Sequence, residues 1–284
     1  MSYLLPTAVF LLMVSVGMSL NLTEVAENWR RLNLSAWLRL LLATFIVPPT
    51  LALLGATVFH LTLAETAGLF LVGVAPGAPL LTRNMARKGF DMHLAASYQL
   101  WAALMIPVMI PLLVAVAGKL YNRDIWIPPA DLLLEIGKKQ FLPLALGMVI
   151  AWLAPIFAKK AQPALNVIGN VVLTVMILLI LVKTGSALKE ISPMVPLAAL
   201  LIAIGSIAVI RIIEFTDPLV QQTFAICNAN RHVGLALLLS GQYLHARQAL
   251  PVVGCYALIT PLVMFAYVKL YPAQSPIGEM ANSS

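Results

Sequence analysis

The sequence predicts an all-α polytopic membrane protein with about nine transmembrane helices, and three observations lead to this fold class. Hydrophobic residues make up 61% of the 284 residues and charged residues only 10%, whereas about 25% of the residues in a soluble domain are charged. Apolar runs long enough to cross a bilayer as helices recur along the whole chain. Two of these runs are interrupted by proline, glycine or polar residues, which indicates broken helices inside the membrane.

Nine apolar runs, separated by charged or turn-forming residues, are the expected spans. Between the fourth and fifth spans, Trp126 and the pair Pro128–Pro129 favour an interfacial connection, which Leu132–Ile136 extends as a short surface helix. Residues 1–271 are expected to form a single transmembrane transporter domain, and the small, polar residues 272–284 a flexible tail. The nine spans cover residues 3–20, 36–58, 66–87, 93–117, 139–157, 164–186, 193–213, 217–240 and 247–271.

The net charge of +7 comes from lysine and arginine residues spread through short loops, without a basic patch that contains aromatic residues. This pattern argues against nucleic-acid binding and is typical of topology signals and of contacts with membrane lipids. Placing the N-terminus outside puts ten of these residues on the cytoplasmic side and seven on the other. We therefore expect an integral protein of a bacterial inner membrane with a cytoplasmic C-terminus.

The third span contains the first interruption. It reads Leu71-Val-Gly-Val-Ala-Pro-Gly-Ala-Pro-Leu-Leu-Thr-Arg-Asn-Met85. Pro76 and Pro79 each remove a backbone donor, and Gly77 between them lets the chain bend, so a straight helix is excluded. The freed backbone groups must face protein, water or a ligand. A simple proline kink is the alternative, but the polar residues Thr82 and Asn84 that follow favour a functional break.

The eighth span contains the second interruption, in the sequence Phe224-Ala-Ile-Cys-Asn-Ala-Asn-Arg-His-Val-Gly-Leu-Ala-Leu-Leu-Leu239. An arginine near the middle of a span costs at least ~2.5–3.5 kcal/mol on insertion scales, so Arg231 should face a cavity and find partners. The alternative is that the polar cluster lies at the membrane edge. The apolar residues on both sides of the cluster argue against that alternative.

The two interrupted spans lie five spans apart, and an odd offset reverses the direction of a helix through the membrane. Paired interruptions in an inverted repeat indicate the central site of a secondary transporter. The N-termini of half-helices carry partial positive charge, which suits an anion. We therefore predict transport of a small organic anion. The candidate substrate-binding residues are Pro76, Gly77, Thr82, Asn84, Gln99, Asn228, Asn230, Arg231 and His232.

Three short motifs carry a resemblance to a known family: Gly17-Met-Ser-Leu20, Leu71-Val-Gly-Val-Ala-Pro-Gly77 and Asn230-Arg-His-Val-Gly-Leu-Ala-Leu237. With these motifs the chain resembles the bile acid:sodium symporter family. The resemblance implies two inverted five-helix repeats, of which the first helix is missing here, and organic-anion transport by alternating access. It also implies a panel of spans 1, 5 and 6, and a core of spans 2–4 and 7–9 in which the two broken helices cross.

The sequence departs from this family where sodium should bind. The resemblance places Cys227 and Arg231 where sodium-coupled members carry an acidic residue and a glutamine, and Leu81 and Thr82 near the position of a Ser-Asn pair. A thiol is a poor sodium ligand and a guanidinium repels sodium. We therefore expect no cofactor or metal site and doubt sodium coupling. The hypothesis is that Arg231 permanently supplies the charge that sodium supplies elsewhere, with His232 a candidate for proton coupling.

Three other functions are alternatives to coupled transport. An intramembrane enzyme needs paired catalytic groups inside the spans, and the aspartates at positions 91, 124, 131 and 217 all lie in or beside loops. We therefore expect no enzyme. A sensor or binding domain that no longer transports, and an anion uniporter without a coupling ion, both remain open. Nothing in the sequence indicates an oligomeric state.

Overall fold

The computed structural model describes residues 4–77, 90–121, 129–183, 191–213, 217–243 and 249–271, and the regular structure in these residues is helical. The tail at residues 272–284 lies outside this part of the chain. Two shorter apolar helices, α1 (Leu4–Ser19) and α5 (Leu63–Val74), accompany six helical stretches that are long and apolar enough to cross a membrane. These six are Leu34–Val58, Leu94–Lys119, Ala130–Leu153, Pro155–Ile180, Val195–Ile212 and Ala249–Leu270.

The first half of the chain contains one helix that the sequence analysis did not expect. This helix, α2 (Leu22–Arg31), begins after Asn21, whose side chain accepts a hydrogen bond from the backbone N–H of Thr23. Asn28 and Trp29 then donate hydrogen bonds to Ser97, which attach α2 to α7. The helices that follow are α3 (Leu34–Leu41), the π-helical turn η1 (Leu42–Ile46), α4 (Val47–Val58), α5 and α7 (Met92–Tyr121).

The fifth span is longer than the sequence predicts, and its first part is no surface helix. Helix α8 (Pro129–Ile136) continues through the π-helical turn η2 (Gly137–Phe141) into α9 (Leu142–Leu153). Leu132 and Ile136 are buried and α8 packs against α7, so this segment belongs to the helix bundle. Lys139, the first residue of the predicted span, forms an ion pair with Glu135 one turn earlier at 2.6 Å, so its charge does not end the helix.

The second half of the chain contains α10 (Pro155–Lys183), α12 (Val195–Ile212), α13 (Pro218–Ala229), α14 (Val233–Tyr243) and α15 (Ala249–Leu270). Helix α10 begins nine residues before the predicted sixth span, at Pro155 directly after α9. Its first turns carry Lys159 and Lys160, whose charges had placed the predicted boundary later. Pro163 lies inside α10, and Pro107 and Pro111 lie inside α7 without interrupting the helix.

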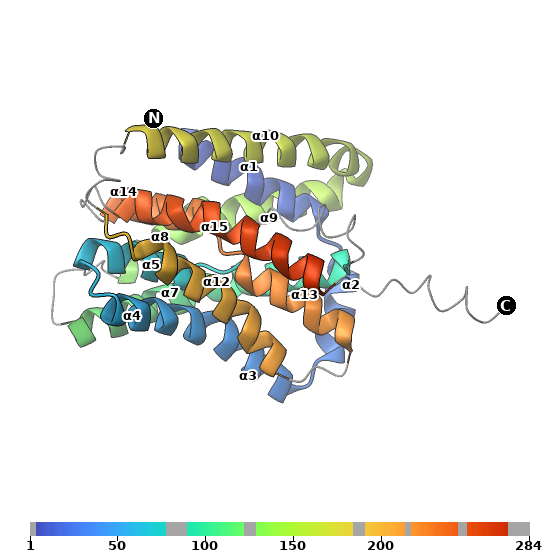
Figure 1. Cartoon of the computed structure of the whole chain (residues 1–284). Coiled ribbons are helices and arrows are strands. Elements are labelled where there is room, and N and C mark those ends of the chain that lie inside the picture. The colour runs from blue at the N-terminus through green and yellow to red at the C-terminus, as the bar shows by residue number, and fades with distance from the viewer. Residues whose placement is uncertain are drawn as a thin grey trace.

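Helix α1 packs against both α9 and α10. Helices α1 and α10 lie along the top of Figure 1. Glycine lets the backbones of α1 and α9 touch: a Cβ atom on Gly17 would lie 2.1 Å from the carbonyl oxygen of Leu144, and one on Gly147 would lie 2.2 Å from that of Val14. This contact gives a physical reason for the glycine in the motif Gly17–Leu20.

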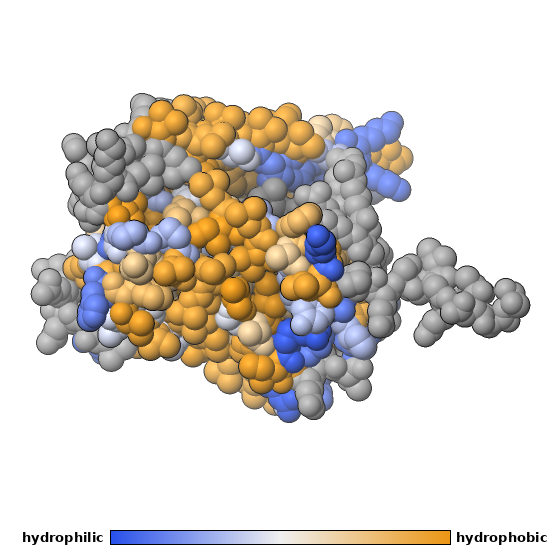
Figure 2. All heavy atoms as spheres, viewed as in Figure 1, coloured by the Kyte–Doolittle hydropathy of each residue, from blue (hydrophilic) through white to orange (hydrophobic). Residues whose placement is uncertain are grey.

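The outer surface suits a lipid environment. Figure 2 shows a face dominated by hydrophobic residues, with hydrophilic residues gathered toward its two ends. Large side chains such as those of Trp152, Val182 and Ile212 are about four-fifths exposed, which is unfavourable in water but not in a bilayer. The described part of the chain is therefore that of an all-helical integral membrane protein.

Candidate substrate site at the two helix breaks

The end of α5, the first break, meets the second break, which lies between α13 and α14. Helix α5 ends at Val74, and α13 ends at Ala229 before α14 begins at Val233. The backbone N–H of His232 donates a hydrogen bond to the carbonyl oxygen of Ala75 at 2.7 Å, which joins the two breaks directly. Backbone groups that the helices leave unpaired thus satisfy one another inside the protein.

Local residues explain both breaks. At the first, Pro76 disfavours a helical conformation at Ala75, and Gly77 has φ +78°, a left-handed conformation that other residues rarely adopt. At the second, the ring of His232 acts as the N-cap of α14, because its Nδ1 accepts a hydrogen bond from the backbone N–H of Leu235 at 3.1 Å. The Tyr256 hydroxyl donates to the carbonyl oxygen of Ala229 at 2.7 Å and so satisfies the end of α13.

The guanidinium of Arg231 is held inside the bundle. The residue is 1% exposed, and its Nη1 donates a hydrogen bond to the carbonyl oxygen of Thr44 at 2.8 Å. A longer bond of 3.4 Å connects Nη2 to Oδ1 of Asn228. In the part of the chain that the structure describes, Arg231 forms no ion pair with a carboxylate. Arg231 therefore does not extend to the protein surface, and a guanidinium is buried at the second break.

The Thr44 carbonyl that accepts from Arg231 is free because of the pair Pro48–Pro49. The Thr44 carbonyl would pair with the N–H four or five residues later, and both of those positions are proline. The π-helical turn η1 pairs Val47 with Leu42 and so takes away the usual partner of Ala43. The Nδ2 of Asn228 donates to the carbonyl oxygens of Ala43, at 3.1 Å, and Ser206, at 2.9 Å.

A buried hydroxyl pair completes this polar network. The Tyr98 hydroxyl in α7 donates to Oδ1 of Asn228 at 3.2 Å and lies 3.2 Å from the Thr44 hydroxyl. The side-chain amide of Asn228 thus uses both its donors and its acceptor, and it connects η1, α7, α12 and α13. Because every partner is buried, a change at Asn228 leaves several polar groups unpaired at once.

A pocket of about 380 Å³ borders the second break. It lies between α10 and α15, and its polar lining comes from the break and from one threonine on each of these helices. Two donors of its lining residues, Arg231 Nε and His232 Nε2, are buried without a hydrogen-bond partner in the described residues. The lining residues are Leu173, Thr174, Ile177, Leu178, Asn230, Arg231, His232, Val233, Gly234, Ala257, Leu258, Thr260 and Pro261.

The predicted site residues occupy different places around the crossing. Asn230, Arg231 and His232 line the pocket, and Asn228 lies in the polar network beside Arg231. Pro76 and Gly77 form the first break but do not line the pocket. Gln99 is buried in α7, and its backbone carbonyl oxygen would lie 3.9 Å from a Cβ atom at Gly77. Thr82 and Asn84 lie outside the described residues.

The sequence analysis missed Thr44, Thr174 and Thr260. The threonines of the pocket, Thr174 and Thr260, lie in apolar helices without a local signal. Thr44 had a detectable signal, because two adjacent prolines in the middle of a span must free carbonyl groups that some buried donor has to satisfy.

These features define a polytopic membrane protein in which two interrupted helices meet around a buried positive charge. The profile of the Sodium Bile acid symporter family matches residues 6–191, nearly two thirds of the chain, and the protein belongs to this family. Members of this family are transporters and not enzymes. The match includes the motifs at residues 17–20 and 71–77 and ends before the second break. A search of the curated proteins gives no match.

Proposed function

We propose that the protein is a secondary active transporter that moves a small organic anion by alternating access. One observation carries the proposal: the Arg231 guanidinium is buried beside a pocket and forms no ion pair in the described residues. A buried charge without a counter-ion is unfavourable, so an anion that enters the pocket gains an interaction that the empty protein lacks. Family membership supports transport as the role of this anion site.

The pocket suits a small carboxylate with an apolar body. Helix α14 begins at the pocket with Val233, so its partial positive charge adds to that of Arg231. The side chains of Leu173, Ile177 and Leu258 supply an apolar wall. A volume of about 380 Å³ lies toward the lower end of ligand pockets, which range over ~300–1,000 Å³.

The position of the pocket supports alternating access. We assign α1, α9 and α10 to the panel and the other spans to the core, with nine spans arranged as an inverted repeat that lacks the family's first helix. The pocket then lies between panel and core, because α10 forms one wall and α14 and α15 form the others. Movement of the core against the panel would open it to either side of a bacterial inner membrane, with the C-terminus in the cytoplasm.

Sodium is not needed at the crossing in this account. Sodium prefers oxygen ligands, and the guanidinium of Arg231 already binds the Thr44 carbonyl that the prolines leave free. Cys227, the other residue that departs from the sodium-coupled members of the family, is buried and is not in a disulfide. Arg231 therefore takes the place of the bound cation and joins the second broken helix to η1.

His232 acts as a cap and donor rather than as a proton carrier in this proposal. The hydrogen bond from the N–H of Leu235 to Nδ1 leaves the ring proton on Nε2. Protonation of Nδ1 would break that bond and uncap α14. The Nε2–H remains available for the anion once the side chains of the pocket wall rearrange around it.

Anion binding can be tested by thermal unfolding of the purified protein against a panel of small carboxylates, in sodium and in potassium chloride. We expect the same carboxylates to stabilise the protein in both salts. Arg231→Met should weaken binding about 10–100-fold, which corresponds to ~1.5–3 kcal/mol for a hydrogen bond to a charged group. Arg39→Met is the control, because Arg39 is exposed near the end of α3 and should not affect binding. Stabilisation by carboxylates in sodium chloride alone would contradict the proposal. An equal loss of carboxylate affinity in Arg231→Met and Arg39→Met would contradict it too.

Flux into proteoliposomes separates transport from its alternatives. We expect exchange of a labelled carboxylate identified by the binding screen, and loss of that exchange in the Arg231→Met protein. Binding without flux would assign the protein to the sensor or binding class. Flux that no ion gradient can drive above equilibrium would identify an uncoupled uniporter.

A further inference from the structure

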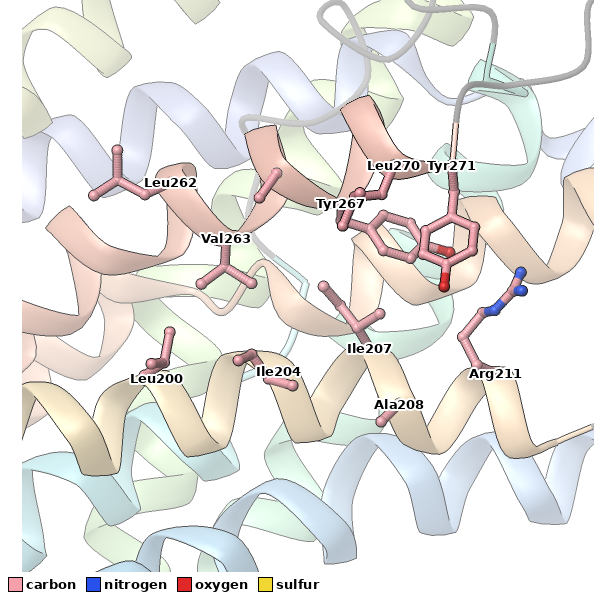
Figure 3. A pocket seen from close by; sticks show the side chains of 11 residues that line it. Leu200, Ile204, Ile207, Ala208, Arg211, Leu262, Val263, Tyr267, Leu270 and Tyr271 are labelled. Carbon is pink, nitrogen blue, oxygen red and sulfur yellow. The ribbon is translucent and has the colours of Figure 1, made fainter.

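A second cavity lies on the outer surface and shares no lining residue with the pocket at the second break. It is a groove of about 610 Å³ between α12 and α15. Figure 3 shows its aliphatic side chains along both helices and, at one end, Arg211 facing the hydroxyl ends of Tyr267 and Tyr271. The lining residues are Leu200, Ile204, Ile207, Ala208, Arg211, Leu262, Val263, Ala266, Tyr267, Leu270 and Tyr271.

We propose that this groove binds one anionic phospholipid, with an acyl chain along the aliphatic part and the headgroup phosphate at Arg211. The length fits a lipid of one leaflet. The lining residues of α12 run from Leu200 to Arg211, about 16 Å of helix at 1.5 Å per residue. Half of a ~30 Å hydrocarbon core is about the same length.

The polar end of the groove lies where a lipid headgroup lies. Arg211 is in the last turn of α12, and Tyr271 directly follows α15, so both helices end there. Tyrosine and arginine at helix ends are typical of the membrane interface. In the proposed topology, this end lies on the cytoplasmic side, where anionic lipids attract basic residues.

The chemistry of Arg211 fits a phosphate. Its guanidinium stacks over the ring of Tyr271 at 4.8 Å, which holds it at the groove. A single long hydrogen bond of 3.4 Å connects it to Gln221, and it forms no ion pair in the described part of the chain. Arginine has five N–H donors, so two adjacent ones are free for a bidentate contact with a phosphate. In Figure 3 the Tyr267 hydroxyl points toward the Arg211 guanidinium.

A lipid is a better occupant than a soluble ligand or another part of the chain. Leu262 and Leu270 are each about 70% exposed on the sides of the groove, so it opens toward the surrounding membrane. The residues after Tyr271 are small and polar, so the tail offers no long apolar segment to fill it. The negative partial charge at the ends of α12 and α15 disfavours an anion, which makes binding depend on Arg211.

Native mass spectrometry tests the proposal on the full chain in detergent with 1-palmitoyl-2-oleoyl phosphatidylglycerol, and with phosphatidylcholine that has the same acyl chains. We expect one phosphatidylglycerol to bind about ten-fold more tightly than phosphatidylcholine, and Arg211→Gln to remove this preference. Lys269→Gln is the matched control, because Lys269 is an exposed cation in the last turn of α15 but does not line the groove. It should change the affinity less than two-fold.

A second variant tests the acyl-chain part of the groove. Ala208→Trp should fill the space between the helices and reduce binding of both lipids. Equal binding of the two lipids to the unaltered protein, or equal losses in Arg211→Gln and Lys269→Gln, would overturn the proposal. A dimer that Ala208→Trp abolishes would also overturn it and assign the groove to a second copy of the chain.

Discussion

The hydrogen bond from Arg231 to the Thr44 carbonyl should depend on the missing N–H at Pro48. Arg231→Met keeps most of the side-chain volume but leaves the Thr44 carbonyl unpaired. In water-soluble proteins such a loss costs ~1–3 kcal/mol, and interhelical hydrogen bonds in membranes average ~0.6 and reach ~1.7 kcal/mol. The same change removes a buried charge without a carboxylate partner in the described residues, which is favourable. The net effect on stability therefore combines opposite contributions.

A double-mutant cycle isolates the carbonyl. Pro48→Ala supplies an N–H four residues after Thr44, so the carbonyl no longer needs the guanidinium. We expect Arg231→Met to be less damaging in the Pro48→Ala protein by about 0.6–1.7 kcal/mol, measured by SDS titration with circular dichroism. Pro107→Ala provides the control, because Pro107 lies inside α7 and belongs to no part of this network.

Additivity decides the outcome. The changes in unfolding free energy caused by two independent substitutions add within about 0.3–0.5 kcal/mol. We expect such additivity for Arg231→Met combined with Pro107→Ala. If Arg231→Met couples to Pro48→Ala no more strongly than to Pro107→Ala, then the prolines do not create the acceptor for Arg231. The argument that links the second span to the second break would then be wrong.

Three further predictions concern the breaks and the helix contact. Gly77→Ala should destabilise the protein by about 1–2 kcal/mol because Gly77 has a positive φ. Gly137→Ala should change the stability by less than about 0.5 kcal/mol, because no atom lies within 4 Å of a Cβ atom placed there. Thermal unfolding measures both variants, and equal losses of stability would show that the backbone at Gly77 does not require glycine. Asn228→Asp should weaken carboxylate binding about ten-fold, because it neutralises Arg231; unchanged binding in the thermal-shift assay would count against an anion site. Gly147→Ala should lower the free energy of unfolding by about 1–3 kcal/mol, because its Cβ atom would overlap the carbonyl oxygen of Val14. SDS titration should detect this loss. An unchanged stability of the variant would show that α1 and α9 separate easily.

The sequence predicts the helical class and the second break well, because both depend on local chemistry. A run of twenty apolar residues has to cross the membrane as a helix. Arg231 inside such a run has to find partners, and the structure buries it among carbonyl groups. Prediction is poorer at the fifth span, because the helical stretch begins at Ala130, nine residues before the predicted start at residue 139. There, an ion pair one turn apart lets the helix continue through the charged segment.

Contacts between distant elements could not be read from the sequence. The pairing of Asn228 with Ala43 joins residues 185 positions apart, and no local pattern identifies which carbonyl an amide will meet. The pocket likewise depends on Thr174 and Thr260, which come together only when α10 packs beside α15. Pro48 and Pro49 show from the sequence that the Thr44 carbonyl lacks a helical partner. They do not show which buried donor binds it.

Uptake into proteoliposomes, with and without sodium, tests the central claim most directly. The labelled carboxylate that stabilises the purified protein best is the substrate, and potassium replaces sodium on both sides of the membrane. If Arg231 holds the place of the bound cation, initial rates in the two salts should agree within a factor of two. Uptake that requires an inward sodium gradient would show that a sodium ion binds despite the guanidinium, and would contradict the account.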